Sequence, residues 1–345
     1  MEYVTLGNTG LAVSRLSFGA VTFTEGNKDV AALYKVEEKL AGRMVGQALD
    51  AGVNFFDTSD AYANGESERL LGRMLKPHRD NVVIATKVGA RFFNVEKLIQ
   101  AGLSRRHIMW AVDQSLKRLD TDWIDVYIAH IEDPFTPLEE TLAAFDDVVR
   151  AGKARYIGFS NWSAWKAAAA LEFQKANGLT PFSHGQVYYS LLGRDIERDF
   201  VQMARRYNLG LTVWSPLAGG FLSGKYTPET MSGPDGRLGG FDIIPFDRTH
   251  GFVLIERMRA VAAAHKATVA QIALAWLLAK PHVTSVILGA STAQQLADNL
   301  GAGDVGLTPA ELGELDALSA LAPVYPNWYQ ENGGDRIYTA VLKSK

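Results

Sequence analysis

The sequence predicts a closed (β/α)8 TIM barrel, in which helices surround eight parallel strands, with an N-terminal β-hairpin as a cap. Three observations carry this prediction. Short apolar or β-branched runs alternate with longer segments of helical period, about eight such runs occur, and polar residues gather where the runs end. Because barrels with inserted loops often have this length, we expect residues 1–345 to form a single domain.

The candidate strands are short and well separated along the chain. They lie at residues 16–19, 54–57, 82–87, 124–130, 155–160, 185–188, 210–215 and 284–288. Between them, segments such as 104–119, 138–151 and 269–279 carry apolar residues three and four positions apart. This spacing predicts amphipathic helices for the outer ring.

The segment ahead of the first strand is expected to cap the barrel floor. Alternating residues at 3–6 and 11–13 flank the turn-rich group 7–10, which predicts a β-hairpin. Two connections, 23–39 and 227–249, are longer than the usual links between elements. In a compact barrel, we expect loops of that length to serve the functional site.

The composition disfavours several classes of partner. Lysine and arginine total 35 against 38 acidic residues, so a formal net charge of −3 provides no broad positive field for nucleic acid or an anionic membrane. The chain has no cysteine, which removes disulfides, thiolate nucleophiles and cysteine metal sites. Residues 1–10 lack the features of a secretion signal, and no run approaches the ~18 apolar residues that span a bilayer. We expect a cytoplasmic protein with no nucleic acid, membrane or required protein partner.

Four titratable residues are predicted to converge at one face. Asp57, Lys87 and His130 stand at the ends of candidate strands, and Tyr62 follows shortly after the first of them. In a parallel barrel, the carboxyl ends of all strands meet where the functional loops lie. Each residue alone has a structural alternative, such as a loop-capping acid or a hydrogen-bonded histidine, but their joint placement indicates a catalytic site.

The sequence resembles the aldo-keto reductase family over nearly its whole length. The resemblance runs from Leu6-Gly-Asn-Thr-Gly-Leu-Ala-Val-Ser14 to Gln294-Gln-Leu-Ala-Asp-Asn299 and includes the specific motif Gly52-Val-Asn-Phe-Phe-Asp-Thr-Ser-Asp-Ala-Tyr62. It is similar to the longer-looped bacterial type, related to the branch of channel β-subunits. The resemblance implies NAD(P)H-dependent, reversible reduction of aldehydes or ketones to alcohols, with a catalytic tetrad of Asp57, Tyr62, Lys87 and His130.

The chemistry of these residue types suits carbonyl reduction. A hydride that reaches a carbonyl carbon leaves negative charge on the oxygen, and Tyr62 can supply a proton there. Because a free phenol has a pKa of ~10, we expect Lys87 to ease ionisation of Tyr62 toward working pH. Asp57 would hold Lys87, and His130 would hydrogen-bond the carbonyl oxygen. A purely structural ion pair between Asp57 and Lys87 is the alternative.

No Gly-x-Gly-x-x-Gly follows a strand, so a Rossmann site is not indicated. The family resemblance implies instead that Ser160, Asn161 and Gln186 bind the nicotinamide amide and that Trp214 stacks on the ring. It implies a pyrophosphate loop and an adenosine site, with Thr22 and Asp57 completing the contacts. The pyrophosphate residues are Ser215, Leu217 and Gly219, and the adenosine residues are Gly289, Ser291, Gln295, Asp298 and Asn299.

The expected cofactor is NADPH, with NADH possible. Many relatives carry an arginine for the 2′-phosphate where Ser291 or Gln295 stands here, so the positive charge would come from Lys225 and Arg237. The helix that starts after residue 289 favours an anion through its free amides, although Ser291 and Thr292 also suit an ordinary capped helix.

Three alternative functions have weaker support. The spacing from Gly219 to Lys225 matches a nucleotide triphosphate loop, but Tyr226 replaces the Ser or Thr that would bind magnesium. A metal-dependent barrel hydrolase lacks His-x-His and His-Glu-x-x-His motifs, and we predict no metal site. A cofactor-binding redox sensor or interaction protein on the same barrel remains open.

The substrate is expected to be a small-molecule carbonyl compound. The predicted pocket comprises residues 21–23, Phe92, Phe93, Glu132, residues 241–246 and Trp328. Its aromatic content favours bulky ketones or aromatic aldehydes.

Overall fold

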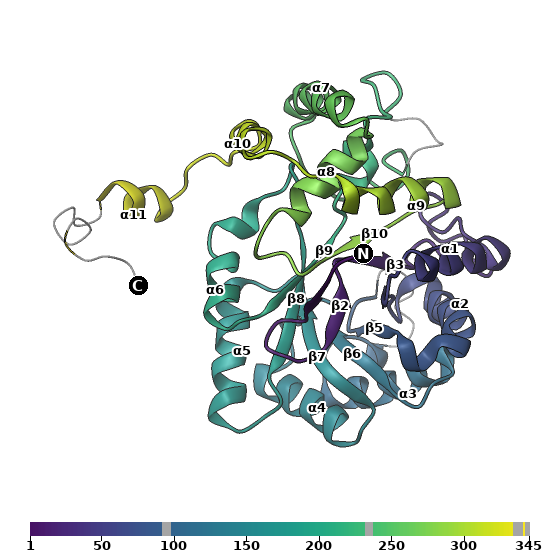
Figure 1. Ribbon diagram of the computed structural model, residues 1–345. Coiled ribbons are helices and arrows are strands. Elements are labelled where there is room, and N and C mark those ends of the chain that lie inside the picture. Colours follow the sequence, from purple (N-terminus) through teal and green to yellow (C-terminus); the bar gives the residue numbers. More distant parts are fainter. Residues whose placement is uncertain (92–97, 232–236, 334–340, 342–345) are drawn as a thin grey trace.

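The structure, a computed structural model, describes residues 1–91, 98–231, 237–333 and 341. Eight parallel strands close into a barrel with helices outside it, which confirms the predicted fold class (Figure 1). The order around the barrel is β10-β3-β4-β5-β6-β7-β8-β9, so consecutive strands pair and the last closes on the first.

The predicted strands are found close to their expected positions. They are β3 (Leu16–Gly19), β4 (Phe55–Asp57), β5 (Val83–Val88), β6 (Ile124–Ala129), β7 (Ala154–Ser160), β8 (Phe182–Tyr188), β9 (Gly210–Trp214) and β10 (Ser285–Leu288). The largest difference is at β8, which begins at Phe182 rather than at residue 185. Phe182, Ser183 and His184 are all buried, so both faces of this strand are covered even though its first residues do not form an apolar run.

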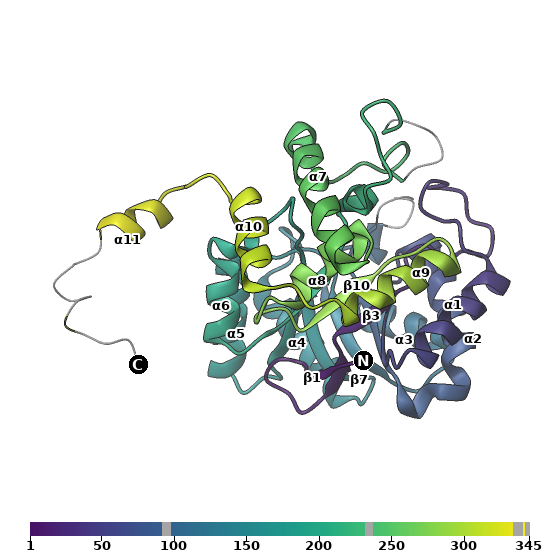
Figure 2. The ribbon, with the colours of Figure 1, turned by 45° about the horizontal axis from the view of Figure 1, so that its top comes forward.

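The helices follow the strands around the outside of the barrel (Figure 2). They are α1 (Glu38–Asp50), α2 (Glu66–Leu75), α3 (Arg105–Leu119), α4 (Leu138–Arg150), α5 (Ala164–Ala176), α6 (Phe200–Arg206), α7 (Arg248–His265), α8 (Val269–Leu278), α9 (Ala293–Leu300), α10 (Pro309–Leu318) and α11 (Asn327–Gly333). The predicted helices correspond to α3, α4 and α8. In both views α11 extends away from the barrel.

The predicted hairpin closes the floor of the barrel. β1 (Tyr3–Thr5) pairs antiparallel with β2 (Ala12–Ser14). Leu6 and Val13 are fully buried in one apolar cluster with inward-facing barrel residues such as Phe55 and Ala85. A side chain at Gly7, which has φ +56°, would lie 2.2 Å from the carbonyl oxygen of Ser183, so the turn fits tightly against the strands.

The alternation of strand residues carries the catalytic candidates to the other end of the same interior. Phe55 of β4 and Ala85 of β5 belong to the apolar cluster above the hairpin. Two positions further on, Asp57 and Lys87 point to the same face because successive side chains alternate. His130 follows directly after β6 in the same way. The floor cluster therefore supports a polar layer at the carboxyl ends of the strands.

Among the described residues, no single helix is long and apolar enough to cross a membrane. Taken together, α7 and α8 are long and apolar enough to cross a membrane, but the pair is bent by 89° at the break between them.

Candidate active site

Lys87 is the centre of the polar layer. Its ammonium group donates to Asp57 Oδ1 at 2.6 Å, to the Thr58 carbonyl oxygen at 2.7 Å and to the Tyr62 hydroxyl at 3.1 Å. These three bonds use all three hydrogens of the ammonium group. The Lys87 side chain is fully buried, so the contacts fix both its position and its charge.

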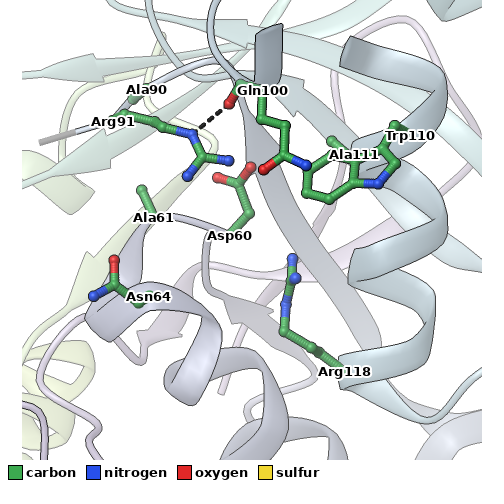
Figure 3. Close-up of a pocket in the computed structure, with 9 residues that line it drawn as sticks. All are labelled: Asp60, Ala61, Asn64, Ala90, Arg91, Gln100, Trp110, Ala111 and Arg118. Carbon is green, nitrogen blue, oxygen red and sulfur yellow. Dashed lines mark hydrogen bonds between the residues drawn. The ribbon is translucent and has the colours of Figure 1, made fainter. Parts of the chain in front are cut away.

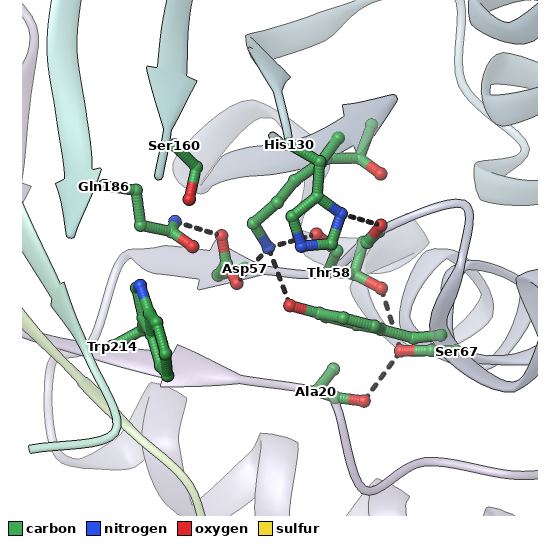
Figure 4. A network of polar contacts seen from close by, with 12 residues as sticks. Ala20, Asp57, Thr58, Ser67, His130, Ser160, Gln186 and Trp214 are labelled. Atoms are coloured by element: carbon green, nitrogen blue, oxygen red, sulfur yellow. Dashed lines mark hydrogen bonds and ion pairs between the residues drawn. The ribbon is translucent and has the colours of Figure 1, made fainter. Parts of the chain in front are cut away.

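Asp57 is held from two sides (Figure 4). One carboxylate oxygen accepts from Lys87, and the other accepts from Gln186 Nε2 at 2.8 Å. The family resemblance implies that Gln186 binds the nicotinamide amide, but here its amide hydrogen supports Asp57. Its Oε1 atom is the one left to face a ligand.

Tyr62 accepts a hydrogen bond from Lys87, so its own hydroxyl hydrogen is available for another acceptor. Burial raises the pKa of Tyr62 above its usual value, and Lys87 opposes this rise without overcoming it. Lys87 therefore eases the ionisation of Tyr62, as expected, but burial outweighs it and the pKa of the phenol stays above its usual value. The phenol remains protonated at neutral pH, which is the form that a proton donor needs.

His130 is neutral in this environment. Burial, and then the charge of Lys87, hold the pKa of its imidazole well below the usual value. Its ring meets the ring of Tyr62 edge-on, with 5.7 Å between centroids, and Ser59 Oγ lies 3.1 Å from Nδ1. Asn161 Nδ2 donates to the His130 carbonyl oxygen at 3.0 Å and fixes the backbone.

Ser160, Asn161 and Trp214 lie beside Asp57 at the ends of β7 and β9. Asn161 Nδ2 also donates to Ser160 Oγ at 2.9 Å, and its Oδ1 accepts from Trp214 Nε1 at 3.0 Å. Tyr188 packs against the Trp214 ring with 5.1 Å between centroids. These contacts hold a hydroxyl, an amide and a flat indole next to the tetrad, and this donor set fits a nicotinamide ring with its amide.

Backbone strain gathers around this end of the barrel. Ala63 and Asn64, just after Tyr62, have φ of 47° and 54°, and Asn161 and Ser215 have φ of 58° and 50°. Left-handed conformations of residues other than glycine cost of order 1–3 kcal/mol each and cluster at functional sites. The strain therefore agrees with a site built from these loops.

The turn after β9 contains the residues expected at the pyrophosphate. Ser215 Oγ accepts from the Gly219 amide at 3.0 Å, so a phosphate contact through that amide would have to displace the hydroxyl. Leu217 accepts from the Gly220 amide within the same turn. Lys225 extends beside this turn, and its Nζ lies 4.9 Å from the Tyr226 ring centroid.

The helix α9 begins as predicted, directly after β10, with Thr292 as its N-cap. Ser291 Oγ donates to Gln295 Oε1 at 3.0 Å, so the two residues expected at the 2′-phosphate contact one another. A side chain built at Gly289 would meet nothing within 4 Å, which leaves open space at this strand end for an adenosine group.

Two further adenosine candidates serve the packing of α9. Asp298 Oδ2 accepts from Thr268 Oγ1 at 2.9 Å, at the start of α8. Asn299 Nδ2 donates to the Gly289 carbonyl oxygen at 3.4 Å. Thr22 makes a similar link, from the first long loop to the Ala290 carbonyl oxygen at 3.0 Å.

Arg237 lies closer to the tetrad than expected. Burial lowers the pKa of its guanidinium, while the nearby hydroxyls of Tyr62 and Tyr226 raise it. Its Nε is buried and makes no hydrogen bond within the described residues, and its guanidinium carbon lies 5.5 Å from the Phe241 ring centroid.

Not all predicted pocket residues line this site. Trp328 belongs to α11, which extends away from the barrel, so its predicted place in the pocket is wrong (Figure 1). Glu132 Oε1 accepts hydrogen bonds from the backbone amide and the hydroxyl of Ser163, the residue just before α5. Glu132 therefore holds the start of that helix. Phe92 and Phe93 lie outside the described residues.

Sequence reasoning missed Thr58, Ser59 and Asp60. All three lie between Asp57 and Tyr62, and this position in the motif could have indicated that they contribute to the site. Within the described part of the chain, no group of three or more His, Asp or Glu residues is arranged to hold a metal ion.

Comparison with known proteins places this barrel in one family. The Aldo/keto reductase family matches residues 15–320. The chain therefore belongs to the aldo-keto reductase family of oxidoreductases, which generally use nicotinamide cofactors.

Among the relatives given below, some are named as channel subunits and one as an oxidoreductase. The chain is 36% identical to a probable voltage-gated potassium channel subunit beta of Oryza sativa subsp. japonica, over 94% of this chain and 98% of that protein. It is 37% identical to a putative voltage-gated potassium channel subunit beta of Schizosaccharomyces pombe, over 92% and 93%. It is 36% identical to the uncharacterized oxidoreductase YrpG of Bacillus subtilis, over 94% and 96%.

Proposed function

We propose that this protein reduces a small-molecule aldehyde or ketone to the alcohol, with NADPH as the preferred cofactor and Tyr62 as the proton donor. The observation that carries the proposal is the bonding of Lys87. Because Tyr62 accepts from Lys87, the phenol is oriented with its hydrogen toward another acceptor.

The cofactor, when bound, supplies the hydride. Ser160, Asn161 and the free oxygen of Gln186 would hold the nicotinamide amide, and Trp214 would cover one face of the ring. The remaining work belongs to the tetrad. Tyr62 gives its proton to the oxygen as negative charge develops there, Lys87 stabilises the phenolate that remains, and Asp57 keeps Lys87 in place.

His130 acts at the same oxygen. Because its imidazole is neutral, it contributes a directed hydrogen bond rather than a positive charge. We place the reaction in the cytoplasm, without nucleic acid, a membrane or a required protein partner.

A panel of carbonyl compounds, assayed by loss of NADPH absorbance with purified protein, tests the proposal. We expect turnover with bulky ketones or aromatic aldehydes and slower turnover with NADH. The matched control is the Tyr62→Phe variant, which keeps the ring and loses the hydroxyl. Equal rates for wild type and variant would contradict the assigned proton donor.

The channel-subunit names of two relatives favour a second candidate, a cofactor-binding redox sensor on the same barrel. A sensor would bind NADPH tightly, as measured by quenching of tryptophan fluorescence, and show negligible steady-state turnover across the panel. Multiple turnovers per protein molecule would decide for the reductase.

A further inference from the structure

Ser59 and Asp60 connect His130 to a side pocket that Asp60 lines. The Ser59 hydroxyl lies 3.1 Å from His130 Nδ1 and donates to Asp60 Oδ1 at 3.3 Å. Ser59 Oγ also accepts a hydrogen bond from the backbone amide of Ala61 at 3.2 Å. A continuous hydrogen-bond chain therefore runs from the imidazole to a carboxylate that the proposed mechanism does not use.

The valences of Ser59 decide how this chain is oriented. A hydroxyl has one hydrogen and two lone pairs. With Asp60 ionised, the Ser59 hydrogen goes to Asp60, one lone pair accepts from Ala61, and the other accepts from Nδ1 of His130. The neutral ring then carries its hydrogen on Nδ1, and Nε2 is unprotonated.

The chain reverses when Asp60 is protonated. The Asp60 hydroxyl then donates to Ser59, the Ala61 amide keeps its lone pair, and the Ser59 hydrogen turns to Nδ1 of His130. The ring must now carry its hydrogen on Nε2. In both arrangements the Ser59 hydroxyl, Nδ1 of His130 and the Ala61 amide have hydrogen-bond partners, so the protonation of Asp60 selects between them.

The surroundings of Asp60 allow both forms near neutral pH. Burial and the carboxylate of Glu68 on α2 raise its pKa to about 7. Arg118 on α3, Arg91 after β5 and the bond from Ser59 oppose the rise. Arg118 also pairs with Glu68 at 2.5 Å, which weakens its effect on Asp60.

Asp60 can exchange its proton with water. It lines a pocket of about 150 Å³ together with Arg91 and Arg118 (Figure 3). This volume holds several water molecules, and Trp110 on the pocket wall is 37% exposed. From β6, Tyr127 is the other titratable neighbour, and burial raises its pKa well above the usual value, so it stays neutral.

We propose that Asp60 is a positioning residue that acts through Ser59 to set which ring nitrogen of His130 carries the hydrogen. The inference rests on the proposed function, because the tautomer matters only where Nε2 meets a substrate oxygen. With Asp60 protonated, Nε2 donates to a carbonyl oxygen, as reduction requires. With Asp60 ionised, Nε2 accepts from an alcohol, as the reverse reaction requires.

The change between the two forms is balanced by one proton. The proton on Nε2 passes to water at the catalytic face, the Ser59 hydrogen moves to Nδ1, and the Asp60 hydrogen moves to Ser59. Asp60 is left ionised, the protein has lost one proton to water, and the reverse transfers restore the first form. No oxidant or reductant takes part.

Nitrogen NMR of protein with labelled histidine tests the inference without turnover. The His130 signals are assigned by their loss in His130→Gln. Between about pH 5 and about pH 9, we expect wild-type His130 to change from the Nε2–H to the Nδ1–H form. Asp60→Asn keeps the shape of the side chain and Ser59→Ala breaks the chain, so both should remove the change.

The control variant is Asp50→Asn, which alters an exposed carboxylate at the end of α1 and should keep the wild-type titration. A His130 tautomer that is constant with pH in wild type, or that titrates normally in Asp60→Asn, would overturn the inference.

Kinetics with NADPH and 4-nitrobenzaldehyde provide the second measurement. We expect kcat for reduction to fall as pH rises through the titration of Asp60. Ser59→Ala should lose this dependence and run about tenfold slower at low pH, the effect of one hydrogen bond, with KM unchanged. If wild type shows the tautomer change but no turnover, the proposed function fails while the assigned role of Asp60 in setting the tautomer stands.

Discussion

At Tyr62, burial and a nearby charge act against each other. Burial raises the pKa of the phenol, and Lys87 at 3.1 Å lowers it. Burial would also lower the pKa of Lys87, but the bonds to Asp57 and Tyr62 leave it raised overall. The lysine is therefore charged and the tyrosine protonated at neutral pH, which is the combination that proton donation requires.

Removal of the phenol hydroxyl should stop most of the chemistry. We expect Tyr62→Phe to lower kcat for carbonyl reduction by ~10² to 10⁴, because it removes the general acid. The dissociation constant for NADPH, measured by fluorescence titration, should change little. Wild-type turnover in the variant, under conditions where chemistry limits the rate, would show that the proton comes from elsewhere.

Removal of the charge beneath Tyr62 should shift its titration. In Lys87→Met, burial acts on the phenol without opposition, so the pKa of Tyr62 rises further. Because alcohol oxidation needs the phenolate as a base, its rate should require a higher pH in the variant than in wild type. The pH profile of alcohol oxidation measures this directly, and an unshifted profile would mean that Lys87 does not tune Tyr62.

At the scale of elements, the loops that follow β9 and β10 carry most of the expected cofactor contacts. The turn after β9 has left-handed backbone at Ala218, Gly219 and Gly220, with φ of 47°, 68° and 93°. Such a run requires small residues, since a side chain in this conformation is strained. The start of α9 supplies amides and neutral side chains, so positive charge for a phosphate has to come from the long loop before α7.

The loop residue Arg237 is expected to distinguish the two cofactors. We predict that Arg237→Ala weakens NADPH binding more than NADH binding, by roughly 1.5 to 3 kcal/mol, as for a hydrogen bond to a charged group. Titration of both cofactors against both proteins measures the difference. Arg248→Ala is the control, because it removes an exposed arginine paired with Asp242 from the same connection. Equal losses for the two cofactors would show that Arg237 does not read the phosphate.

At the scale of the whole molecule, the sequence predicted the barrel, and the common end at which Asp57 and Lys87 lie, because both follow from simple periodicities. Alternation along β4 and β5 places Asp57 and Lys87 on one face whatever the details of packing. Side-chain bonds are harder to predict. The bond from Gln186 to Asp57 joins residues 129 positions apart, and the link from Ser59 to His130 depends on the shape of one turn.

Buried neutral histidines should make the molecule sensitive to acid. Burial lowers the pKa of His184 to about 3, so its contribution to stability is complete above its unfolded pKa and is lost as pH falls toward the folded value. Between about pH 6.5 and pH 5 this group alone should cost about 2 kcal/mol of unfolding free energy. Urea unfolding at both pH values measures the loss.

The matched variant is His184→Gln, which cannot take up a proton. Its unfolding free energy should depend less on pH over the same interval. An equal pH dependence in wild type and variant would assign the acid sensitivity to other groups.

Because the hairpin closes one end of the barrel, ligands can approach the site only from the other end. Leu6 and Val13 fill the end opposite the tetrad. Within the described residues, the cofactor and the substrate therefore enter and leave at the carboxyl ends of the strands. The ligand that lies deeper in the site must then bind before the other ligand and dissociate after it. If the nicotinamide lies beneath the substrate, product inhibition should show NADP⁺ competing with NADPH, and the alcohol product inhibiting noncompetitively against it. The two apolar side chains at the closed end would thus impose an ordered sequence of binding and release on every turnover.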